Sequence, residues 1–424
     1  MYALLDSNNY YVSCERAFNP RLEGIPVGVL SSNDGCIVAR SDEMKALGVE
    51  MGTPRHLLPK HIQQQSVFLS SNYCLYGDMA RRITEILRMM TAHVEVYSID
   101  ESFCSLIGYP TDTLETHCRN IRETIYQWTG IRVSVGIASS KVLAKVATRA
   151  AKKQPWRDGV CQLETDSEET RQLLMKQATN DLWGIAHRTA SKLELMGIKN
   201  AYDLRQADPK LIRSKLGVVN ERIIWELRGY SAIQIEDMDH PRQRIMVSRS
   251  FGRTTGIQAD VAEAVRVYTS RAAEKLRRQK SVASALLVFI RTNSFHTSSP
   301  QYSNRIVVPL EPATDDTLAL NAAAQRGLQS IYRRGFGYQK AGVMLMDLQS
   351  KQHRQLALGE QSDYVEDAKR ERLMGVMDKL NATMGKGTIK IGLPRSNGAS
   401  QAKVNHRSPR YTTHWNELPI IKAK

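Results

Sequence analysis

The sequence has few cysteines and no long apolar run. The six cysteines (positions 14, 36, 74, 104, 118 and 161) form no CxxC pair and do not cluster in a short loop-rich segment, which argues against a zinc site or a disulfide framework. The longest apolar run, "ASALLVFI", has about half the length that a membrane span needs. The first fifteen residues lack the basic start of a signal peptide. We expect an untargeted, soluble, cytoplasmic protein with no membrane partner.

Acidic residues are outnumbered by basic ones. The chain has 59 lysines and arginines against 43 aspartates and glutamates, a formal net charge of +16 that favours polyanionic partners. Residues 1–110 nevertheless hold nine basic and twelve acidic side chains. The N-terminal segment is therefore acidic, and the rest of the chain is basic. At 424 residues, the chain should fold as about three or four domains.

The pattern of apolar residues changes along the chain. Strands alternate with helices in the first 165 residues, which predicts an α/β or α+β layer structure. Short helices with glycine turns follow in 166–240, and 241–350 shows the β-α-β-β-α-β order of a ferredoxin-like fold. The last 74 residues hold fourteen basic and seven acidic side chains, and we expect 351–424 to be a basic, loosely folded tail.

Three carboxylates occur where predicted strands end or turn. Asp6 closes the strand "YALLD", and Asp100 and Glu101 occupy the tip of the hairpin "YSIDESF". A sheet that aligned these ends would gather three hard oxygen ligands with no nearby histidine, which suits Mg²⁺. Two such ions could support phosphoryl transfer. The alternative for each acid is a solvated turn with no function.

The segment after Asp6 predicts a phosphate site. The amides of Ser7 to Tyr11 enter a short helix, with Asn8 as a possible cap, and a helix N-terminus offers free N–H donors to phosphate. Tyr10 and Tyr11 could lie against the sugar attached to that phosphate, where a flat ring would exclude a ribose 2′-hydroxyl. The alternative is that both tyrosines belong to the core.

Three lysines share one face of the helix predicted to start near Ser140. Lys141, Lys145 and Lys152 fall within roughly 40° of one another at helical spacing. Such a stripe is usually a solvated face, but here it follows a strand of the same domain and is well placed to neutralise phosphates.

Two Gly-Ile turns lie between short helices in the segment 181–204. A helix, glycine turn and second helix let backbone amides approach DNA phosphates closely and bind without reading sequence. One such turn is a weak signal, but "KLGVVNERIIWELRGYS" repeats the plan in a basic chain. We therefore expect non-specific duplex binding here.

The sequence resembles the Y-family of translesion DNA polymerases, in particular its bacterial UmuC type. The resemblance runs over nearly the whole chain and is carried by "DSNNYYVSCE", "SSNDGCIVAR", "KALGVEMG", "YSIDESF", "VSVGIASSKVLAKVA", "WGIAHRTASKLELMGI", "SRSFG" and "SPRYTTHW". It implies a multidomain α+β right hand: palm and fingers in 1–165, with the fingers at about 20–76. A helical thumb with helix-hairpin-helix turns would occupy 166–240 and a ferredoxin-like little finger 241–350.

The resemblance also implies roles for individual residues. Two Mg²⁺ ions would be held by Asp6, Asp100, Glu101 and the carbonyl of Ser7, and Tyr11 would be the steric gate against ribonucleotides. The incoming deoxynucleoside triphosphate would be bound by Asn8, Asn9, Tyr10, Tyr11, Lys45 and Lys152. Primer-template DNA would be contacted by Gly184, Ile185, Ala186, Gly197, Arg249 and Ser250.

The sequence departs from the Y-family pattern at three places. Asp42 and Lys45 stand where many members have a tyrosine and an arginine that contact the triphosphate; Lys45 could still serve, and Asp42 could not. The hairpin turn at 184–186 reads "GIA" rather than "GIG". The peptide "QLALG" (355–359) ends in glycine, where sliding-clamp peptides of this type generally end in an aromatic residue, which counts against clamp docking.

The resulting hypothesis is an error-prone translesion DNA polymerase. By resemblance it would act in the SOS response to DNA damage, with a processed UmuD′ dimer and RecA as partners. Two alternatives use the same residues: a two-metal nuclease, and a non-catalytic DNA-binding subunit with vestigial acids. The lysine stripe and the tyrosine pair favour a triphosphate substrate over cleavage.

Overall fold

The computed structural model describes residues 1–236, 241–296, 298–353, 364–385, 387–392 and 403–420. The chain forms two compact units. The first unit comprises residues 1–31, 35–239 and 406–424, and the second comprises 32–34 and 240–405. The expected boundary near residue 240 therefore coincides with a division of the fold, whereas the expected palm, fingers and thumb segments pack into one unit. "QLALG" lies outside the described residues.

A five-stranded sheet organises the first unit, in the order β5-β6-β1-β7-β8. Its strands are β1 (Tyr2–Ser7), β5 (Val94–Val96), β6 (Glu101–Ser105), β7 (Val133–Ala138) and β8 (Val160–Gln162). The central strand β1 pairs antiparallel with both β6 and β7, and every residue of β7 is buried. β1 is therefore fixed on both edges, which holds its final residues in place.

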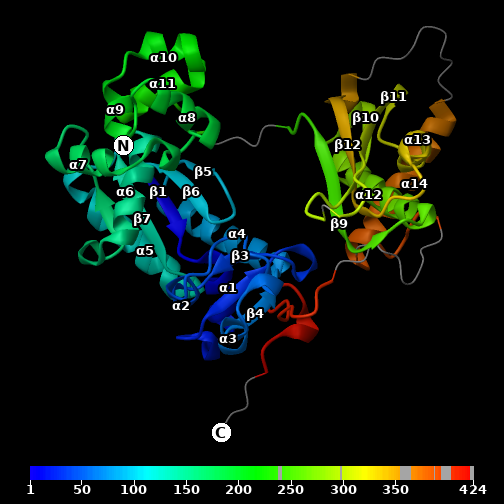
Figure 1. Cartoon of the computed structure of the whole chain (residues 1–424), viewed down its shortest axis with the longest axis horizontal. Helices are drawn as coiled ribbons and strands as arrows, with labels where there is room; N and C mark the ends of the chain where they lie inside the picture. Colours follow the sequence, from blue (N-terminus) through cyan, green and yellow to red (C-terminus); the bar gives the residue numbers. More distant parts are fainter. Residues whose placement is uncertain (237–240, 297, 354–363, 386, 393–402, 421–424) are drawn as a thin grey trace. The chain divides into compact units, whose positions relative to one another are not determined.

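Helices cover both faces of this sheet (Figure 1). Ala3 and Leu5 belong to the core shared with α1 (Tyr10–Phe18), α4 (Tyr73–Met90) and α5 (Leu114–Thr129). Leu4 lies on the opposite face, in the core shared with α6 (Lys141–Lys153). Because strand residues alternate between faces, Asp6 projects on the same side as Leu4, toward α6.

A glycine lets α6 approach the sheet closely. A Cβ atom built on Gly136 of β7 would lie 2.1 Å from the Thr148 backbone nitrogen and 2.3 Å from the Ala144 carbonyl oxygen. Any side chain there would push α6 away from the strands. Ser140 caps the N-terminus of α6, where its hydroxyl accepts a hydrogen bond from the Leu143 N–H. The predicted lysine stripe is thus held against the end of β1.

The segment between α1 and α4 forms a second, three-stranded sheet in the order β3-β2-β4. Its strands are β2 (Val27–Leu30), β3 (Ile37–Arg40) and β4 (Val67–Ser70), accompanied by the short helices α2 (Asp42–Ala46) and α3 (Lys60–Gln65). A small apolar cluster that includes Ile37, Met44 and Phe68 fills its interior. This sheet corresponds to the expected fingers at about 20–76.

Five helices follow, as expected for 166–240: α7 (Glu168–Lys176), α8 (His187–Leu195), α9 (Ala201–Gln206), α10 (Pro209–Leu216) and α11 (Val218–Leu227). Their apolar side chains join the same core as α6. The buried Glu226 carboxylate accepts from the N–H groups of Val142 and Ile233. The helical segment is therefore continuous with the α6 side of the main sheet.

The second unit has the predicted β-α-β-β-α-β order: β9 (Ile245–Thr255), α12 (Gln258–Arg278), β10 (Ser281–Thr292), β11 (Ser303–Thr314), α13 (Thr317–Ile331) and β12 (Tyr338–Ser350). The sheet order is β11-β10-β12-β9, so one strand lies between the two strands of each βαβ connection. Both helices contribute to one core with one face of the sheet.

The prediction of a loosely folded tail after residue 350 is wrong for most of its described part. Helix α14 (Tyr364–Thr383) packs on the second unit, where Met374 is buried and the Arg277 guanidinium binds both oxygens of Asp378 at 2.7 Å. Residues 406–420 return to the first unit and lie beside α1 and β4 (Figure 1). No helix among the described residues is long and apolar enough to cross a membrane.

Candidate active site

The backbone positions of the three predicted carboxylates are adjacent at the end of β1. Asp6 is paired directly with Glu101 across β1 and β6, and with Ser134 across β1 and β7. The Ser7 N–H donates to the Asp100 carbonyl at 2.8 Å, which fixes the turn before β6 beside the end of β1. Asp6 and Glu101, 95 positions apart in the sequence, are thus brought together by strand register, as the sequence predicted.

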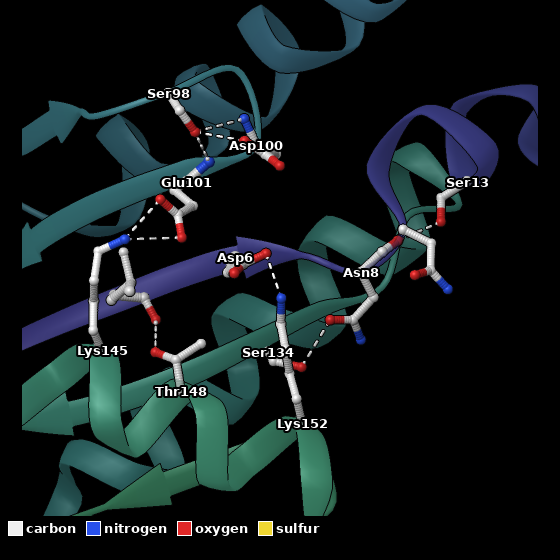
Figure 2. A network of polar contacts seen from close by, with 12 residues as sticks. Asp6, Asn8, Ser13, Ser98, Asp100, Glu101, Ser134, Lys145, Thr148 and Lys152 are labelled. Atoms are coloured by element: carbon white, nitrogen blue, oxygen red, sulfur yellow. Dashed lines mark hydrogen bonds and ion pairs between the residues drawn. The ribbon is translucent and has the colours of Figure 1, made fainter. Parts of the chain in front are cut away.

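Two of these carboxylates are bound by lysines of α6. The Lys152 ammonium lies 2.6 Å from Asp6 Oδ1, and the Lys145 ammonium donates to both Glu101 oxygens at 2.9 and 3.0 Å. Figure 2 shows Asp6 turned toward Lys152 and Glu101 toward Lys145. Asp100 accepts a 2.5 Å hydrogen bond from the Ser98 hydroxyl, which also accepts from the Glu101 N–H.

The Asp6 carboxyl has an unusual pKa. Burial raises it from 3.8 to about 6, the Lys152 ammonium opposes that rise, and the negative charges of Glu101 and Asp100 add to it. Negative charge is therefore concentrated around Asp6 in a partly desolvated site. A cation bound there would relieve this repulsion.

The donor set fits magnesium chemically. It consists of three carboxylates and nearby backbone carbonyls, which are the hard oxygen ligands that Mg²⁺ prefers. Among the described residues, no three carboxylate, histidine or cysteine side chains already converge on one point as a formed metal site would. Cation binding therefore requires Asp6 and Glu101 to exchange their lysine partners for the ion.

Every lysine of the predicted stripe has an acidic partner, and Lys141 and Lys145 are withdrawn from solvent, whereas Lys152 is exposed, as a solvated face would have it. Lys141 is buried and its ammonium lies 2.5 Å from Glu95 Oε2. Lys145 also lies over the rings of Tyr97 and Trp183, 4.8 and 5.5 Å from their centroids. The sequence pattern predicts no role for these two aromatic residues, because only the fold brings Trp183 next to the hairpin.

A cavity of about 320 Å³ opens beside the acids. Asp6, Glu101 and the two lysines form one wall, and Trp183 with Asp181 and Leu182 from the helical segment forms another. The Trp183 ring nitrogen donates to the Tyr97 hydroxyl at 2.8 Å, which closes the aromatic side. Such a concave, partly apolar space with convergent charged groups is typical of a ligand site.

The structure separates the two tyrosines that were predicted together. Tyr10 is 4% exposed and its hydroxyl donates to the Tyr76 carbonyl at 2.6 Å, so its side chain belongs to the core and cannot contact a nucleotide. Tyr11 is only partly buried. Its ring stacks on Tyr76 with centroids 4.4 Å apart and meets Tyr73 edge-on at 5.9 Å. Tyr11 alone remains a candidate for sugar contact.

The predicted phosphate cradle is smaller than expected. The Ser7 N–H is bonded to Asp100 and the Asn8 N–H to the Arg132 carbonyl at 2.9 Å, so neither amide can serve a phosphate. Asn8 is not the cap of α1 either, because its side chain accepts from the Ser134 hydroxyl. Asn9 precedes the helix in the left-handed region, at φ +48°.

Lys45 lies within reach of the same region. Its ammonium donates to the Asn9 side-chain oxygen at 2.6 Å and pairs with Asp42 at 2.8 Å. Helix α2 thus supplies a lysine beside the start of α1, where a triphosphate was predicted to bind. Asp42 neutralises that lysine rather than contributing a donor of its own.

The predicted DNA contacts in the helical segment surround α8. Gly184 and Gly197 are exposed, with φ of +85° and +81°, and Ala186 is also exposed. Ile185 is buried, and its N–H donates to the Leu182 carbonyl, while the Gly197 N–H donates to Glu194. The Ile185 side chain and these two amides are therefore already engaged within the protein.

Arg249 and Ser250 lie on opposite faces of the edge strand β9. Arg249 is paired with Ala341 in the row that faces the helices. Burial lowers the pKa of Arg271 on α12, and the charge of Arg249 lowers it further. Ser250 is paired with Lys340, which is paired in turn with Arg291. This second row lies on the face turned away from the helices, and its two cations, Lys340 and Arg291, were not among the predicted DNA contacts.

Comparison with known proteins identifies the family. Residues 5–149 match the impB/mucB/samB family, 242–358 match the C-terminal domain of that family, and 371–421 match a domain of unknown function. The chain is 41% identical to Protein UmuC and 38% identical to Protein ImpB, both of Salmonella typhimurium, and each alignment covers the whole of both chains. The chain belongs to the impB/mucB/samB family of Y-family DNA polymerases.

More distant similarities agree with this assignment. The impB/mucB/samB chain is 27% identical to DNA polymerase IV 1 of Bacillus subtilis over 94% of each protein. A solved Y-family DNA polymerase chimera of Dbh and Dpo4 shares its fold, with a TM-score of 0.64 at 19% identity, over 82% of this chain and 99% of that one. The predicted UmuC-type resemblance, the α+β polymerase fold and the class of DNA-directed DNA polymerase are confirmed. The roles of individual site residues stay predictions.

Proposed function

We propose that this Y-family polymerase is an error-prone translesion enzyme that adds deoxynucleotides to a primer 3′ end opposite damaged template. The observation that carries the proposal is the pairing of Asp6 with Glu101 across β1 and β6, with Asp100 beside them and the α6 lysines on the same face. Oxygen ligands and phosphate-binding cations therefore lie at one end of one sheet.

Asp6, Asp100, Glu101 and the Ser7 carbonyl would hold two Mg²⁺ ions. When bound, such ions lower the pKa of the attacking primer hydroxyl and neutralise charge on the leaving pyrophosphate. The protein contributes position and charge. The strand register holds the acids at a fixed spacing, and the aromatic pair Tyr97 and Trp183 holds Lys145 over Glu101.

Lys152 and Lys45 are the proposed triphosphate contacts. Lys152 binds Asp6 in this structure, so contacting a phosphate would require it to leave that carboxylate. The exchange suits a site where a metal ion takes over Asp6, because each charge keeps a partner. The exposed edge of the Tyr11 ring would lie under the sugar and exclude a 2′-hydroxyl.

The proposed substrate, cellular DNA, implies a cytoplasmic location and a role in DNA damage. By similarity to UmuC we propose induction in the SOS response, with a UmuD′ dimer and RecA as partners. The net charge of +16 is consistent with polyanionic DNA as the principal ligand.

Primer extension tests the proposal. The purified full chain, alone and with UmuD′ and RecA, should extend a primer on a template with an abasic site in the presence of Mg²⁺ and deoxynucleotides. Asp100→Asn should lower incorporation at least roughly a thousandfold, because a transition-state charge contact is lost. Asp112→Asn removes an acid in an exposed turn and serves as the matched control.

The same gel separates the competing functions. Shortened DNA strands in place of extended ones would identify a nuclease. DNA binding with no incorporation at any Mg²⁺ concentration would identify a non-catalytic subunit. An Asp100→Asn protein as active as the parent would remove these acids from the chemistry.

The gate assignment has its own test. Tyr11→Ala should incorporate CTP far better than the parent does, while retaining use of dCTP, because the ring that meets the 2′-hydroxyl is gone. Unchanged preference for dCTP over CTP would refute this role for Tyr11 without affecting the metal-site proposal.

A further inference from the structure

Tyr11 rests on a chain of contacts that leads away from the acids. Its ring stacks on Tyr76 at an interplanar angle of 13°, and Tyr76 itself is fully buried. The position of the Tyr11 ring over the sugar site therefore depends on where Tyr76 lies. Tyr73, from the same end of α4, meets the Tyr11 ring edge-on.

Tyr76 is fixed by a buried carboxylate. Its hydroxyl donates to Glu15 Oε1 at 2.7 Å, and Glu15 is 1% exposed. The same oxygen accepts a second hydrogen bond, at 3.0 Å, from the Ser408 hydroxyl. Burial raises the pKa of Glu15, and these two hydroxyls oppose the rise. A buried carboxylate depends strongly on such donors, because an unsatisfied one is costly.

The segment that supplies Ser408 is anchored at several points. The Asn72 amide donates to the Ser408 carbonyl, the Ser408 hydroxyl oxygen and the Pro409 carbonyl, at 2.9 to 3.2 Å. Asn72 also caps α4, the helix of Tyr73 and Tyr76. His406 exchanges two 3.0 Å hydrogen bonds with Ser70, and Tyr411 stacks on Phe18 at 4.9 Å. Residues 406–411 are thus built into the first unit.

We propose that residues 406–411 set sugar selectivity, by holding Glu15 and Tyr76 in place beneath the Tyr11 ring. Ser408, Glu15 and Tyr76 are positioning residues in this account, and none of them touches the nucleotide. The inference rests on the proposed function and on Tyr11 as the sugar gate. A ring that excludes one hydroxyl group works only if it cannot retreat, so loosening its support admits ribose before it slows the use of deoxyribose.

Two variants remove the hydroxyls that support the gate. Ser408→Ala removes one donor to Glu15, and Tyr76→Phe removes the other while keeping the ring under Tyr11. The measured quantity is the ratio of kcat/KM for dCTP to that for CTP in primer extension by the full chain. We expect this ratio to fall roughly three- to tenfold in each variant, the scale of one ordinary net hydrogen bond. The efficiency with dCTP should change less than about twofold.

Matched controls separate positioning from folding. Ser330→Ala removes a similar serine hydroxyl bonded within α13 of the second unit, and its ratio should equal that of the parent. Ser408→Thr keeps the hydroxyl and should retain the parental ratio. A purely structural role would lower dCTP and CTP incorporation together and leave the ratio constant, even where a thermal melt shows lower stability.

The outcomes distinguish failure of the proposed positioning role from failure of the Tyr11 gate or of the polymerase activity. Unchanged ratios in both Ser408→Ala and Tyr76→Phe, with a Tyr11→Ala protein that accepts CTP, would overturn the inference alone. An unchanged ratio in Tyr11→Ala would overturn the gate and this inference with it. Failure of the unsubstituted chain to extend any primer would overturn the proposed function and, through it, the inference.

Discussion

The five-stranded sheet of the first unit and the four-stranded sheet of the second unit differ in how their lysines and arginines are paired. On the α6 face of the first sheet, Lys141, Lys145 and Lys152 each bind an acid, at 2.5 to 2.9 Å. On the four-stranded sheet of the second unit, the face turned away from the helices places Lys340 directly opposite Arg291, so that like charges are neighbours. Burial lowers the pKa of Lys340, and the charge of Arg291 lowers it further.

The difference indicates what each surface requires from a ligand. A lysine that already has a carboxylate can only exchange partners, which suits a site where metal and phosphate arrive together. Cations that repel one another gain from any polyanion, whatever its sequence, which suits a DNA backbone. The following substitutions test this contrast.

Lys152→Ala should produce the largest effect. Without the ammonium, the triphosphate loses a charge-assisted contact, and we expect the KM for deoxynucleotides to rise roughly ten- to thirtyfold in steady-state primer extension. Lys153→Ala, at the exposed neighbouring position of α6, is the control and should change KM less than about twofold. Equal effects of the two variants would mean that the position of Lys152 beside Asp6 has no role in substrate binding.

Lys340→Ala and Arg291→Ala should each weaken primer-template binding by a smaller amount, roughly three- to tenfold, and lower the salt dependence of log Kd by about one unit of slope. Fluorescence anisotropy at several salt concentrations measures both quantities. Arg278→Ala removes an exposed cation that pairs with Glu274 on α12 and should leave the slope unchanged. If the salt dependence of log Kd is the same in Lys340→Ala and Arg291→Ala as in the parent, DNA does not contact this face of the sheet.

The smallest effect concerns Glu15, the buried acid whose two side-chain donors are hydroxyls rather than lysines. Its pKa is raised above the ordinary 4.5, so the folded state holds the proton more tightly than the unfolded state. Its contribution to stability is therefore present below pH 4.5 and is lost as pH rises through the folded pKa.

Glu15→Gln should lack this decline. Thermal melts from pH 4 to 8 should show the melting temperature of the variant falling less with increasing pH than that of the parent, by a few degrees at most. Parallel curves for the two proteins would mean that Glu15 titrates as it does in the unfolded chain.

The sequence was informative where local patterns set the structure. Alternation placed Asp6 at a strand end, and helical spacing placed three lysines on one face, so the meeting of acids and lysines followed from periods of two and 3.6 residues. The order of elements in 245–350 was predicted for the same reason.

Single-residue differences were less predictable. Tyr10 and Tyr11 are adjacent and chemically identical, yet one is core and the other borders the site, because the start of α1 rotates them apart. Arg249 and Ser250 were assigned together although a strand must place neighbours on opposite faces. That correction was available from the sequence once β9 was recognised as regular.

The docking of residues 406–411 could not be predicted from local pattern. Ser408 and Glu15 are 393 positions apart, and the segment has neither helical nor strand periodicity. The segment is held by hydrogen bonds to the side chains of Asn72 and Ser70 and by stacking on the Phe18 ring. Only the assembled fold brings these groups within reach. Contacts of this kind leave no trace in local periodicity.

The return of residues 406–411 to α1 also constrains biosynthesis. During translation, Ser408, which donates to Glu15 and accepts from Asn72, emerges only after the entire second unit has been made. Residues 1–239 therefore lack this support while the ribosome adds the 166 residues from 240 to 405. A messenger interrupted within residues 240–405 would yield a product that contains Asp6, Asp100 and Glu101 but lacks the segment that supports Tyr76 beneath the Tyr11 ring.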